Sequence, residues 1–456
     1  MTWNLNGNPY EVQSRALDKC GGRGEFGYWM EMGLGKTAVA LSDFLELWLN
    51  HDVDILIVIC PNTLKRNWAK EAETWLKMDP NIRVWPELGS VIDMPNIFII
   101  NYETLIYSGG EEVDRLINRY RCMVVLDESI MIKNHKAKKT KWLLQRKTLM
   151  EYRRCLSGSP IVQGPHDLWA QLTFLSANGK SNYFAFRNYF CRMGGWQGKQ
   201  VLGVKKDREL ELANMVDQVG FRARKDEWTD LPPKIYTERR FDLTRDQTAH
   251  YTTMRDDLIA YVQGEEIEVH MVITKIMKLQ QISSGWVNSE EGEPIKIPGK
   301  NPKLDLLLEL YETRDTPIVV NAHYRHSIQD IFDALDKKKI PYSFITGGMQ
   351  DEDIEAEKFK FNTGEADIII CQVRSAKYGH TLLGTEDNRC ATAVYYENNY
   401  SLDDRIQSED RIHRHGQTND SVLYIDLIGT EEEIDIIKCL QHKSNVAQSI
   451  IDYFRR

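Results

Sequence analysis

The stretch YWMEMGLGKTAVAL, residues 28–41, decides the fold, because an apolar run, a glycine turn and an amphipathic helical pattern follow one another within it. The phosphate-binding loop pattern has a glycine, four residues and then Gly-Lys-Thr. Gly35, Lys36 and Thr37 match it, whereas Met30 stands at the leading glycine position. At the start of a helix, backbone N–H groups converge where a phosphate can bind. The stretch predicts a phosphate-binding loop, although a glycine turn with a solvated lysine would contain the same residues.

Each polar residue of such a loop has a defined task. Gly33 and Gly35 let the backbone approach the nucleotide. Lys36 reaches the β- and γ-phosphates of ATP, and the hydroxyl of Thr37 binds Mg²⁺. We therefore expect ATP and Mg²⁺ as the ligands of this turn.

A pair of acids follows an apolar run about ninety residues further along the chain. The run CMVVL (122–126) ends in Asp127 and Glu128, and doubly wound sheets bind ligands at the carboxyl ends of their strands. Asp127 is predicted to bind Mg²⁺ and Glu128 to polarise the attacking water. Two acids after a strand are often only a solvated turn, but together with the phosphate-binding loop they predict a Walker B site for ATP hydrolysis.

Short apolar runs elsewhere read as buried parallel strands, separated by helical patterns such as residues 37–50 and 327–339. The alternation of strand and helix predicts an α/β protein with doubly wound sheets. The expected strands are residues 54–60, 96–100 and 122–128 in the first half and 317–324, 367–372, 392–398 and 422–428 in the second.

The pattern changes between these two sets of strands, where aromatic-rich helical segments and one hairpin, GGWQGKQVLGVKK (194–206), are expected. We therefore predict an N-terminal ATP-binding lobe over residues 1–172, a mostly helical insertion and linker over 173–296, and a C-terminal lobe over 297–456.

Composition bounds the class of protein. The chain has 456 residues, of which 42% are hydrophobic and 27% charged, enough for two or three domains with cores. The start of the chain lacks a targeting pattern and the apolar runs are too short to cross a bilayer, so we expect a soluble, cytoplasmic protein with no membrane partner. Its eight scattered cysteines predict reduced thiols rather than disulfides or a zinc site. The net charge of −9 means that any nucleic acid must be held by a local basic surface.

Seven segments, in order, resemble motifs of the SWI/SNF-type (Snf-two) ATPases of helicase superfamily two, and the match runs almost end to end. The segments are MEMGLGKT (30–37), CPNTLKRNWAKE (60–71), NYETL (101–105), DESIMIKN (127–134), LSGSPIVQGPHDLWAQLTFL (156–175), RARKDEWTDLPPK (222–234) and QSEDRIHRHGQ (407–417). The resemblance is to compact phage or bacterial members, and it implies two RecA-like doubly wound lobes with helical insertions between them.

The resemblance also assigns residues to the nucleotide. Arg411 and Arg414 match the final motif, where arginines neutralise the charge that develops during hydrolysis; their spacing of three would place both on one face of a helix. A surface pair with neighbouring acids is the alternative. Gln13, in the segment NPYEVQSRAL (8–17), matches the adenine-reading glutamine, although an exposed helical glutamine would look the same. Gly379 is the glycine retained in SAKYGHTLL.

DNA is the partner that the resemblance implies, held mainly by its backbone phosphates. Histones are not expected as partners. The basic run 133–141 could lie beside the duplex, but a solvated helix face accounts for it equally well. The DNA-binding candidates are Lys65, Arg66, Asn67 and Tyr102 in the first half, and His323, Tyr324, Arg325, Thr346 and Gly347 in the second.

Two departures from the family pattern affect its coupling motifs. Where the family has His after Asp-Glu-Ala, this chain has Ile130, which cannot make the polar link expected there. The Asn-Leu-containing motif of the second lobe is replaced by SAKYGHTLL.

Three functions remain open from the sequence. The first is a DNA-dependent ATPase that moves along or remodels duplex DNA with low sequence specificity. The second is a helicase that separates strands, regresses forks or migrates branches. The third is a non-catalytic scaffold with a relic ATP site, which the presence of Lys36, Asp127, Glu128, Arg411 and Arg414 argues against.

Overall fold

The structure is a computed structural model. It describes residues 2–437 apart from positions 88, 163, 180–181, 195–199, 229–230, 263–268, 290–291, 374–380, 400, 432 and 435–436. These residues form two compact units, with the division between residues 230 and 231.

The first unit contains a seven-stranded sheet in the order β3-β4-β2-β5-β6-β1-β9, in which all neighbouring strands are parallel. Its central strands β2, β4 and β5 are buried on both faces, as their continuous apolar sequences require. The strands are β1 (Glu25–Met30), β2 (Ile55–Cys60), β3 (Asn81–Val84), β4 (Asn96–Asn101), β5 (Cys122–Leu126), β6 (Tyr152–Leu156) and β9 (Gly220–Ala223).

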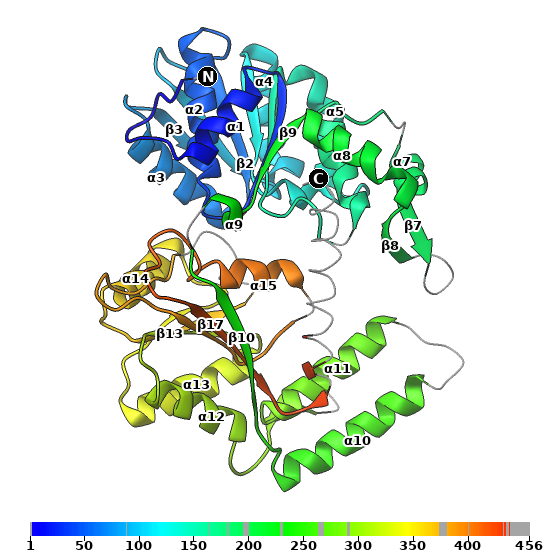
Figure 1. Cartoon of the computed structure of the whole chain (residues 1–456), viewed down its shortest axis with the longest axis vertical. Helices are drawn as coiled ribbons and strands as arrows, with labels where there is room; N and C mark the ends of the chain where they lie inside the picture. Colours follow the sequence, from blue (N-terminus) through cyan, green and yellow to red (C-terminus); the bar gives the residue numbers. More distant parts are fainter. Residues whose placement is uncertain are drawn as a thin grey trace. The chain divides into compact units, whose positions relative to one another are not determined.

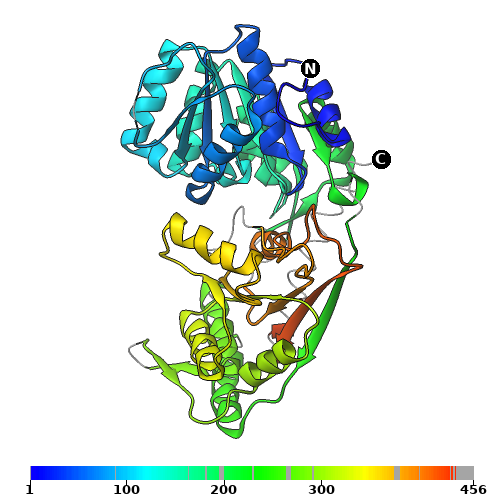
Figure 2. The same cartoon turned by 90° about the vertical axis from the view of Figure 1, so that its left-hand side faces the viewer.

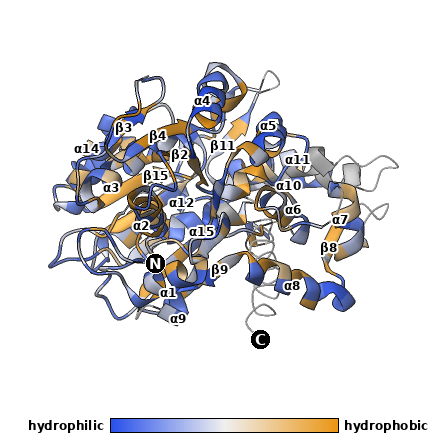
Figure 3. Cartoon of the chain, turned by 90° about the horizontal axis from the view of Figure 1, so that it is seen from above, coloured by the Kyte–Doolittle hydropathy of each residue, from blue (hydrophilic) through white to orange (hydrophobic). Residues whose placement is uncertain are grey.

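Helices cover both faces of this sheet (Figure 1, Figure 2). The apolar core that they enclose appears as orange strand segments, for example at β4, in Figure 3. The helices are α1 (Glu11–Cys20), α2 (Lys36–Leu49), α3 (Lys65–Trp75), α4 (Ser108–Arg119), α5 (Lys138–Arg146), α6 (Leu168–Phe174), α7 (Tyr183–Phe190), α8 (Glu209–Gln218) and α9 (Lys225–Trp228).

The second unit contains a six-stranded parallel sheet in the order β10-β17-β16-β13-β15-β14. Its strands are β10 (Lys234–Arg240), β13 (Ile318–Ala322), β14 (Ser343–Ile345), β15 (Ile368–Gln372), β16 (Thr392–Tyr395) and β17 (Val422–Ile428). Its helices are α10 (Arg245–Val262), α11 (Val269–Ser283), α12 (Pro302–Glu312), α13 (Arg325–Lys338), α14 (Asp351–Asn362) and α15 (Leu402–Glu409).

All seven strands expected from apolar runs are present, and each unit is an α/β, doubly wound, RecA-like lobe. The expected hairpin is also present, as β7 (Cys191–Gly194) paired antiparallel with β8 (Gln200–Val204). A second small hairpin pairs β11 (Trp286–Asn288) with β12 (Pro294–Lys296). The segment 173–296, expected to be mostly helical, contributes a strand to each sheet: β9 extends the first beside β1, and β10 pairs with β17 in the second.

Strand β6 was not predicted, because its sequence carries two arginines. Arg154 is fully buried and pairs with Asp43 of α2, its Nε lying 2.6 Å from Oδ2. The hydroxyl of Tyr28 donates to the same carboxylate oxygen at 2.8 Å. A buried charge is tolerated when it is paired and hydrogen-bonded, so this strand depends on a partner that lies far away in the sequence.

The seven cysteines that the structure describes are buried and form no disulfide, in agreement with the prediction of reduced thiols. Within the described part of the chain, no helix is both long enough and apolar enough to span a bilayer.

Candidate functional site

The glycine turn between β1 and α2 has the backbone that a phosphate-binding loop needs. Gly33 and Gly35 have φ values of 85° and 76°, a left-handed conformation that glycine adopts at little cost. A side chain at Gly35 would also collide with Gln13, because its Cβ would lie 2.1 Å from Nε2. α2 begins at Lys36, so its first N–H groups, which have no acceptors within the helix, lie at this turn.

Gln13 lies against this turn rather than in solvent. It is 4% exposed, and its Oε1 accepts a hydrogen bond from the backbone N–H of Tyr10 at 2.8 Å. The exposed helical glutamine considered as an alternative is therefore not what the structure contains. Gln13 and Gly35 come from different elements, α1 and the β1–α2 turn, and the fold brings them together.

Lys36 and Thr37 occupy the first turn of α2 and are both partly exposed. The ammonium of Lys36 donates to the backbone carbonyl of Met30 at 2.9 Å. This acceptor carries no formal charge, so an anion at the turn would be a stronger partner for the lysine.

Asp127 directly follows β5 and is 6% exposed. Its Oδ2 accepts from the indole N–H of Trp68 at 2.8 Å, and its Oδ1 accepts from the backbone N–H of Glu128 at 2.9 Å. Burial raises the pKa of Asp127, whereas the hydrogen bond from Trp68 and the charge of Lys36 lower it. β1 and β5 are parallel strands of the same sheet, so the turn that carries Lys36 and the acid that follows β5 lie at the same edge of that sheet.

Glu128 has an unusual backbone for a residue with a side chain. Its φ and ψ are 50° and 56°, and it is 6% exposed. A left-handed residue other than glycine is uncommon and costs energy, and such residues concentrate at functional sites. The conformation sets the direction in which the chain leaves β5 and places two consecutive acids, with different backbone angles, at one edge of the sheet.

Ser129 connects this acidic turn to the segment SGSP (157–160). Its hydroxyl lies 2.8 Å from Oε1 of Gln171, and the Gln171 amide nitrogen donates to the carbonyl of Pro160 at 2.9 Å. Both side chains are fully buried. Ile130, the next residue, is buried and apolar, and the hydrogen bond to Gln171 is made by Ser129.

The donor set at this edge fits Mg²⁺ bound together with phosphates rather than a preformed metal cage. The described residues contain no group of three or more His, Cys, Asp or Glu that could hold a metal. Mg²⁺ in nucleotide sites commonly uses one or two carboxylates and takes its other oxygens from phosphates and water. Asp127, with the Thr37 hydroxyl, offers that set.

Arg411 and Arg414 do not share a helical face as their spacing suggested. α15 ends at Glu409, and both arginines lie beyond it in turns. The two also differ in environment: Arg411 is 2% exposed, whereas Arg414 is partly exposed. The carboxylate of Glu409, the last residue of α15, binds Lys234 at 2.9 Å and Arg405 at 2.8 Å.

The buried guanidinium of Arg411 is incompletely satisfied. Its Nη1 donates to Oδ1 of Asn321 at 3.0 Å, while Nε and Nη2 have no hydrogen-bond partner among the described residues. A buried charge without a counter-ion is costly. Such a group is expected where a ligand supplies the missing negative charge.

The segment Leu231–Lys234 packs against the arginine turns. The ammonium of Lys234 binds Glu409 and lies 3.9 Å from Asp410. The carbonyl of Pro232 lies 2.9 Å from Nε2 of His413. This Leu-Pro-Pro-Lys segment belongs to one of the motifs that resemble the family, and no role was predicted for it. In the structure it contacts the loop that carries Arg411.

The DNA-binding candidates of the first unit fall into two groups. Lys65 and Arg66 lie in the first turn of α3, where Lys65 is partly exposed and Arg66 exposed. The amide of Asn67 donates to Glu71 at 2.9 Å. Tyr102, in contrast, is fully buried and donates from its hydroxyl to the carbonyl of Asp127 at 2.9 Å. The expectation that its side chain contacts DNA is therefore wrong for this structure, and Tyr102 supports the acidic turn instead.

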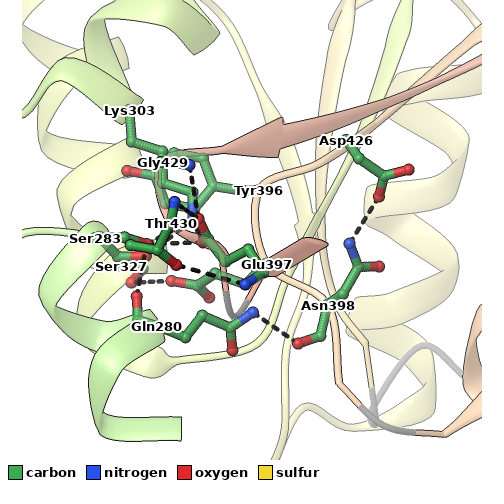
Figure 4. A network of polar contacts seen from close by, with 12 residues as sticks. Gln280, Ser283, Lys303, Ser327, Tyr396, Glu397, Asn398, Asp426, Gly429 and Thr430 are labelled. Carbon is green, nitrogen blue, oxygen red and sulfur yellow. Dashed lines mark hydrogen bonds and ion pairs between the residues drawn. The ribbon is translucent and has the colours of Figure 1, made fainter. Parts of the chain in front are cut away.

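The candidates of the second unit begin with the turn after β13. Figure 4 shows the buried Glu397 that organises it. Its Oε2 accepts from the backbone N–H groups of His323 and Tyr324 at 2.8 and 3.0 Å, and its Oε1 binds the hydroxyl of Ser327 at 2.5 Å. Tyr324 is 8% exposed and its hydroxyl donates to Oε1 of Gln280 at 3.0 Å. The side chain of Tyr324 is thus a packing element rather than an exposed contact, whereas His323 is partly exposed.

The remaining candidates lie at other edges of this unit. Thr346 and Gly347 follow β14, and both are at least partly exposed. The N–H of Gly347 donates to the side chain of Gln372 at 2.8 Å. Arg325 begins α13 and is exposed. Gly379, expected at the nucleotide, lies outside the described residues.

Two family profiles match the chain. The SNF2-related domain matches residues 30–285, more than half of the 456 residues, and the helicase conserved C-terminal domain matches residues 302–416.

The relatives include phage and eukaryotic proteins. Protein p41 of Acyrthosiphon pisum secondary endosymbiont phage 1 is 26% identical over 337 residues, 68% of this chain and 71% of that protein. The SWI/SNF-related matrix-associated actin-dependent regulator of chromatin subfamily A-like protein 1 of Xenopus tropicalis is 24% identical over 415 residues, 88% of this chain. This chain spans only 41% of the length of the Xenopus protein. Among solved structures, the Sulfolobus solfataricus SWI2/SNF2 ATPase core in complex with dsDNA aligns over 99% of this chain and 94% of that one, with 22% identity and a TM-score of 0.44.

Proposed function

The chain belongs to the family of proteins that carry the SNF2-related domain, and we propose that it is a DNA-dependent ATPase that moves along or remodels double-stranded DNA with low sequence specificity. ATP hydrolysis follows from the family and its helicase C-terminal domain. The observation that carries the proposal furthest is that the turn with Lys36 follows β1 and the buried Asp127 follows β5, so both lie at the same edge of one parallel sheet. A functional motor needs both groups at one nucleotide.

In the proposed reaction, Gly33, Gly35 and the first N–H groups of α2 bind the phosphates of ATP, and Lys36 binds the outer ones. Gln13, held beside Gly35, reads the adenine. Thr37 and Asp127 would hold Mg²⁺, which neutralises phosphate charge when bound. Glu128 orients and polarises the attacking water.

Arg411 and Arg414 supply the positive charge that the transferred phosphoryl group requires. The two unpartnered nitrogens of Arg411 support this role, because they are available to an anion at no cost in existing hydrogen bonds. Gly379 is kept as a further candidate for this site.

Binding to duplex DNA is proposed from the family and from exposed cationic groups. Lys65 and Arg66 lie in the first turn of α3 and Arg325 in the first turn of α13. Lysine and arginine side chains are common donors to DNA phosphates. The chain carries a net charge of −9, so only local basic surfaces can attract DNA. Affinity is therefore expected to fall steeply as salt rises and to vary little with sequence.

A strand-separating or branch-migrating helicase is the second candidate. The observation that favours it is the hairpin β7–β8, which projects from the region between the two sets of sheet strands expected from sequence. Its two paired strands offer an element against which DNA strands can part.

ATP turnover measured with blunt duplex, single-stranded, forked and four-way-junction DNA tests the proposal, with Lys36→Ala as the inactive control. Stimulation by blunt duplex together with displacement of a triplex-forming strand supports movement along the duplex. Stimulation by single strands alone, with strand separation and no triplex displacement, would replace it with the second candidate. If none of these DNAs stimulates ATP turnover, both the duplex motor and the helicase are refuted.

A further inference from the structure

A cluster of aromatic side chains lies on the first unit and contains none of the residues assigned to ATP. We call His135, Trp169, Tyr183 and Phe184 the aromatic patch. The rings of His135 and Tyr183 stack with centroids 3.7 Å apart and planes inclined by 9°. Phe184 packs edge-on against both, at 5.4 Å from His135 and 5.5 Å from Tyr183. Trp169 lies 5.8 Å from Tyr183.

The patch is open to solvent at one end. Phe184 lies in the first turn of α7 and is 51% exposed. A large apolar side chain is therefore in water at a position where the helix would accept a polar residue. Tyr183 and His135 are partly exposed beside it. Exposed aromatic clusters are unusual on a soluble surface unless they bind something.

The rim of the patch is basic. The charged groups that act on His135 are Lys136, Lys141 and Arg187, and together with burial they lower its pKa, so the ring is neutral at pH 7. The Arg187 guanidinium lies over the ring of Phe184, 5.5 Å from its centroid. Asp167 is an acidic group that also acts on this region. It is 1% exposed, and its Oδ2 accepts a hydrogen bond from the N–H of Val162.

Several buried nitrogen atoms of the patch and its neighbours have no hydrogen-bond partner among the residues that the structure describes. They are Nε2 of His135, Nδ1 of His166, Nε1 of Trp169 and Nε of Arg187. Unsatisfied buried polar atoms are rare and cost free energy. The cluster therefore carries a cost in free energy that its packing alone does not offset with hydrogen bonds among the described residues.

We propose that the aromatic patch is a binding site for an unpaired nucleobase of DNA, with Phe184 and Tyr183 as the stacking surface and Arg187 as the cation beside the adjoining phosphate. The proposal rests on the DNA-dependent function proposed above. A base offers a flat π-face for stacking, and its adjoining phosphate offers a negative charge to the basic rim. In an intact duplex the base faces are already stacked, so the ligand is a single-stranded or displaced nucleotide.

Part of the aromatic patch lies on the helix that precedes the β7–β8 hairpin. α7 carries Tyr183, Phe184 and Arg187, and it continues directly into the hairpin strand β7. A base held on the patch would lie close along the chain to the element proposed for strand separation. The patch therefore predicts a preference for DNA that has both a duplex and an unpaired arm.

The test uses a forked duplex with 2-aminopurine at successive positions of one unpaired arm, and a blunt duplex labelled internally. Stacking quenches this fluorophore, so quenching on the wild-type protein reports a bound base without need of ATP. Phe184→Ala is expected to abolish the quenching and to weaken binding to the fork by about 5- to 150-fold, the equivalent of about 1–3 kcal/mol for one stacked base. Phe184→Trp, which keeps a stacking surface, should restore both.

Phe359→Ala is the matched control, because Phe359 is likewise a largely exposed phenylalanine, at 62%. It should leave the quenching and the affinity for the fork unchanged. Binding to the blunt duplex and the turnover that it stimulates should be unchanged in Phe184→Ala.

Unchanged quenching and affinity in Phe184→Ala would overturn the proposal. Equal losses on fork and blunt duplex would also overturn it, because the patch would then contact the duplex backbone. Absence of quenching by the wild-type protein, with tight fork binding, would leave a protein or peptide as the ligand of the patch and reject the nucleobase. Failure of the proposed motor function is distinguishable, since it would appear as turnover that no DNA stimulates.

Discussion

Trp68 of α3 donates from its indole N–H to Oδ2 of Asp127 at 2.8 Å, which fixes the carboxylate that follows β5. This hydrogen bond favours the ionised carboxylate, whereas burial disfavours it and raises the pKa of Asp127. The ionised form is the one that can bind Mg²⁺. The acidic limb of the pH–rate profile should therefore depend on Trp68.

Trp68→Phe is expected to move that acidic limb to higher pH. Loss of the hydrogen bond raises the pKa of Asp127 further. As the pH falls, the variant should therefore lose activity at a higher pH than the wild-type protein, and well above the new pKa the two activities should be alike. The measurement is kcat/KM for ATP against pH at saturating Mg²⁺. Trp75→Phe, on the same helix but without a bond to Asp127, is the control; a limb that both variants leave in place would contradict the prediction.

Glu128→Gln should separate binding from hydrolysis. The amide keeps the size of the side chain but cannot polarise water, so turnover is lost while ATP affinity is retained. Equilibrium binding of a fluorescent ATP analogue and steady-state turnover measure the two quantities. Lys36→Ala provides the contrast, because it should lose affinity as well. A Glu128→Gln protein that no longer binds nucleotide would make Glu128 a structural residue, in line with its strained backbone.

Arg414→Ala should lower turnover on the order of 10³-fold with little change in ATP affinity, if this arginine stabilises the transferred phosphoryl group. Arg414→Lys should recover only part of the rate, since a lysine cannot make the same two-point contact. Arg411→Ala should also lower the melting temperature, because Arg411 is buried and bonded to Asn321. A normal specific activity in Arg414→Ala would exclude the role.

Lys234→Met should reduce turnover through the arginine loop without touching nucleotide. The substitution removes the ion pair with Glu409, and Tyr236 and Arg405 remain as partners of that carboxylate. The expected cost is about 1.5–3 kcal/mol of stability, the range for a hydrogen bond to a charged group. A fall in kcat with unchanged ATP affinity in Lys234→Met, with kcat restored in Lys234→Arg, would support a role of Lys234 in positioning the arginine loop. If Lys234→Arg restores stability but not kcat, that role is refuted.

The Ser129–Gln171 pair should behave as a unit. Gln171→Leu leaves the Ser129 hydroxyl and the Pro160 carbonyl without their partner and should cost about 1–3 kcal/mol. Adding Ser129→Ala removes one of the stranded groups and should recover part of that loss. Denaturant unfolding of the four proteins of this double-mutant cycle gives the coupling energy. Additive effects would show that the pair is not coupled.

The sequence by itself determined the class of fold, and it predicted the residues of an ATP site. Apolar runs that are long enough for a strand and too short for a helix identified β2, β4, β5 and β17, because strands buried on both faces need no polar residues. Gly35, Lys36 and Asp127 were predictable because a phosphate and a metal ion require those residue types at the ends of strands. The hairpin β7–β8 was also visible, through its glycine-rich pattern.

Only the tertiary structure decided which distant residues meet. β6 was invisible because Arg153 and Arg154 interrupt its apolar pattern, and their burial depends on partners such as Asp43, more than a hundred residues away. The burial of Tyr102, the end of α15 before Arg411, and the contacts of Trp68 with Asp127 and of Lys234 with Glu409 are likewise set by packing. A local pattern reports which side chains must leave water, but it does not report which buried partner satisfies a charge, and that choice exists only in the folded chain.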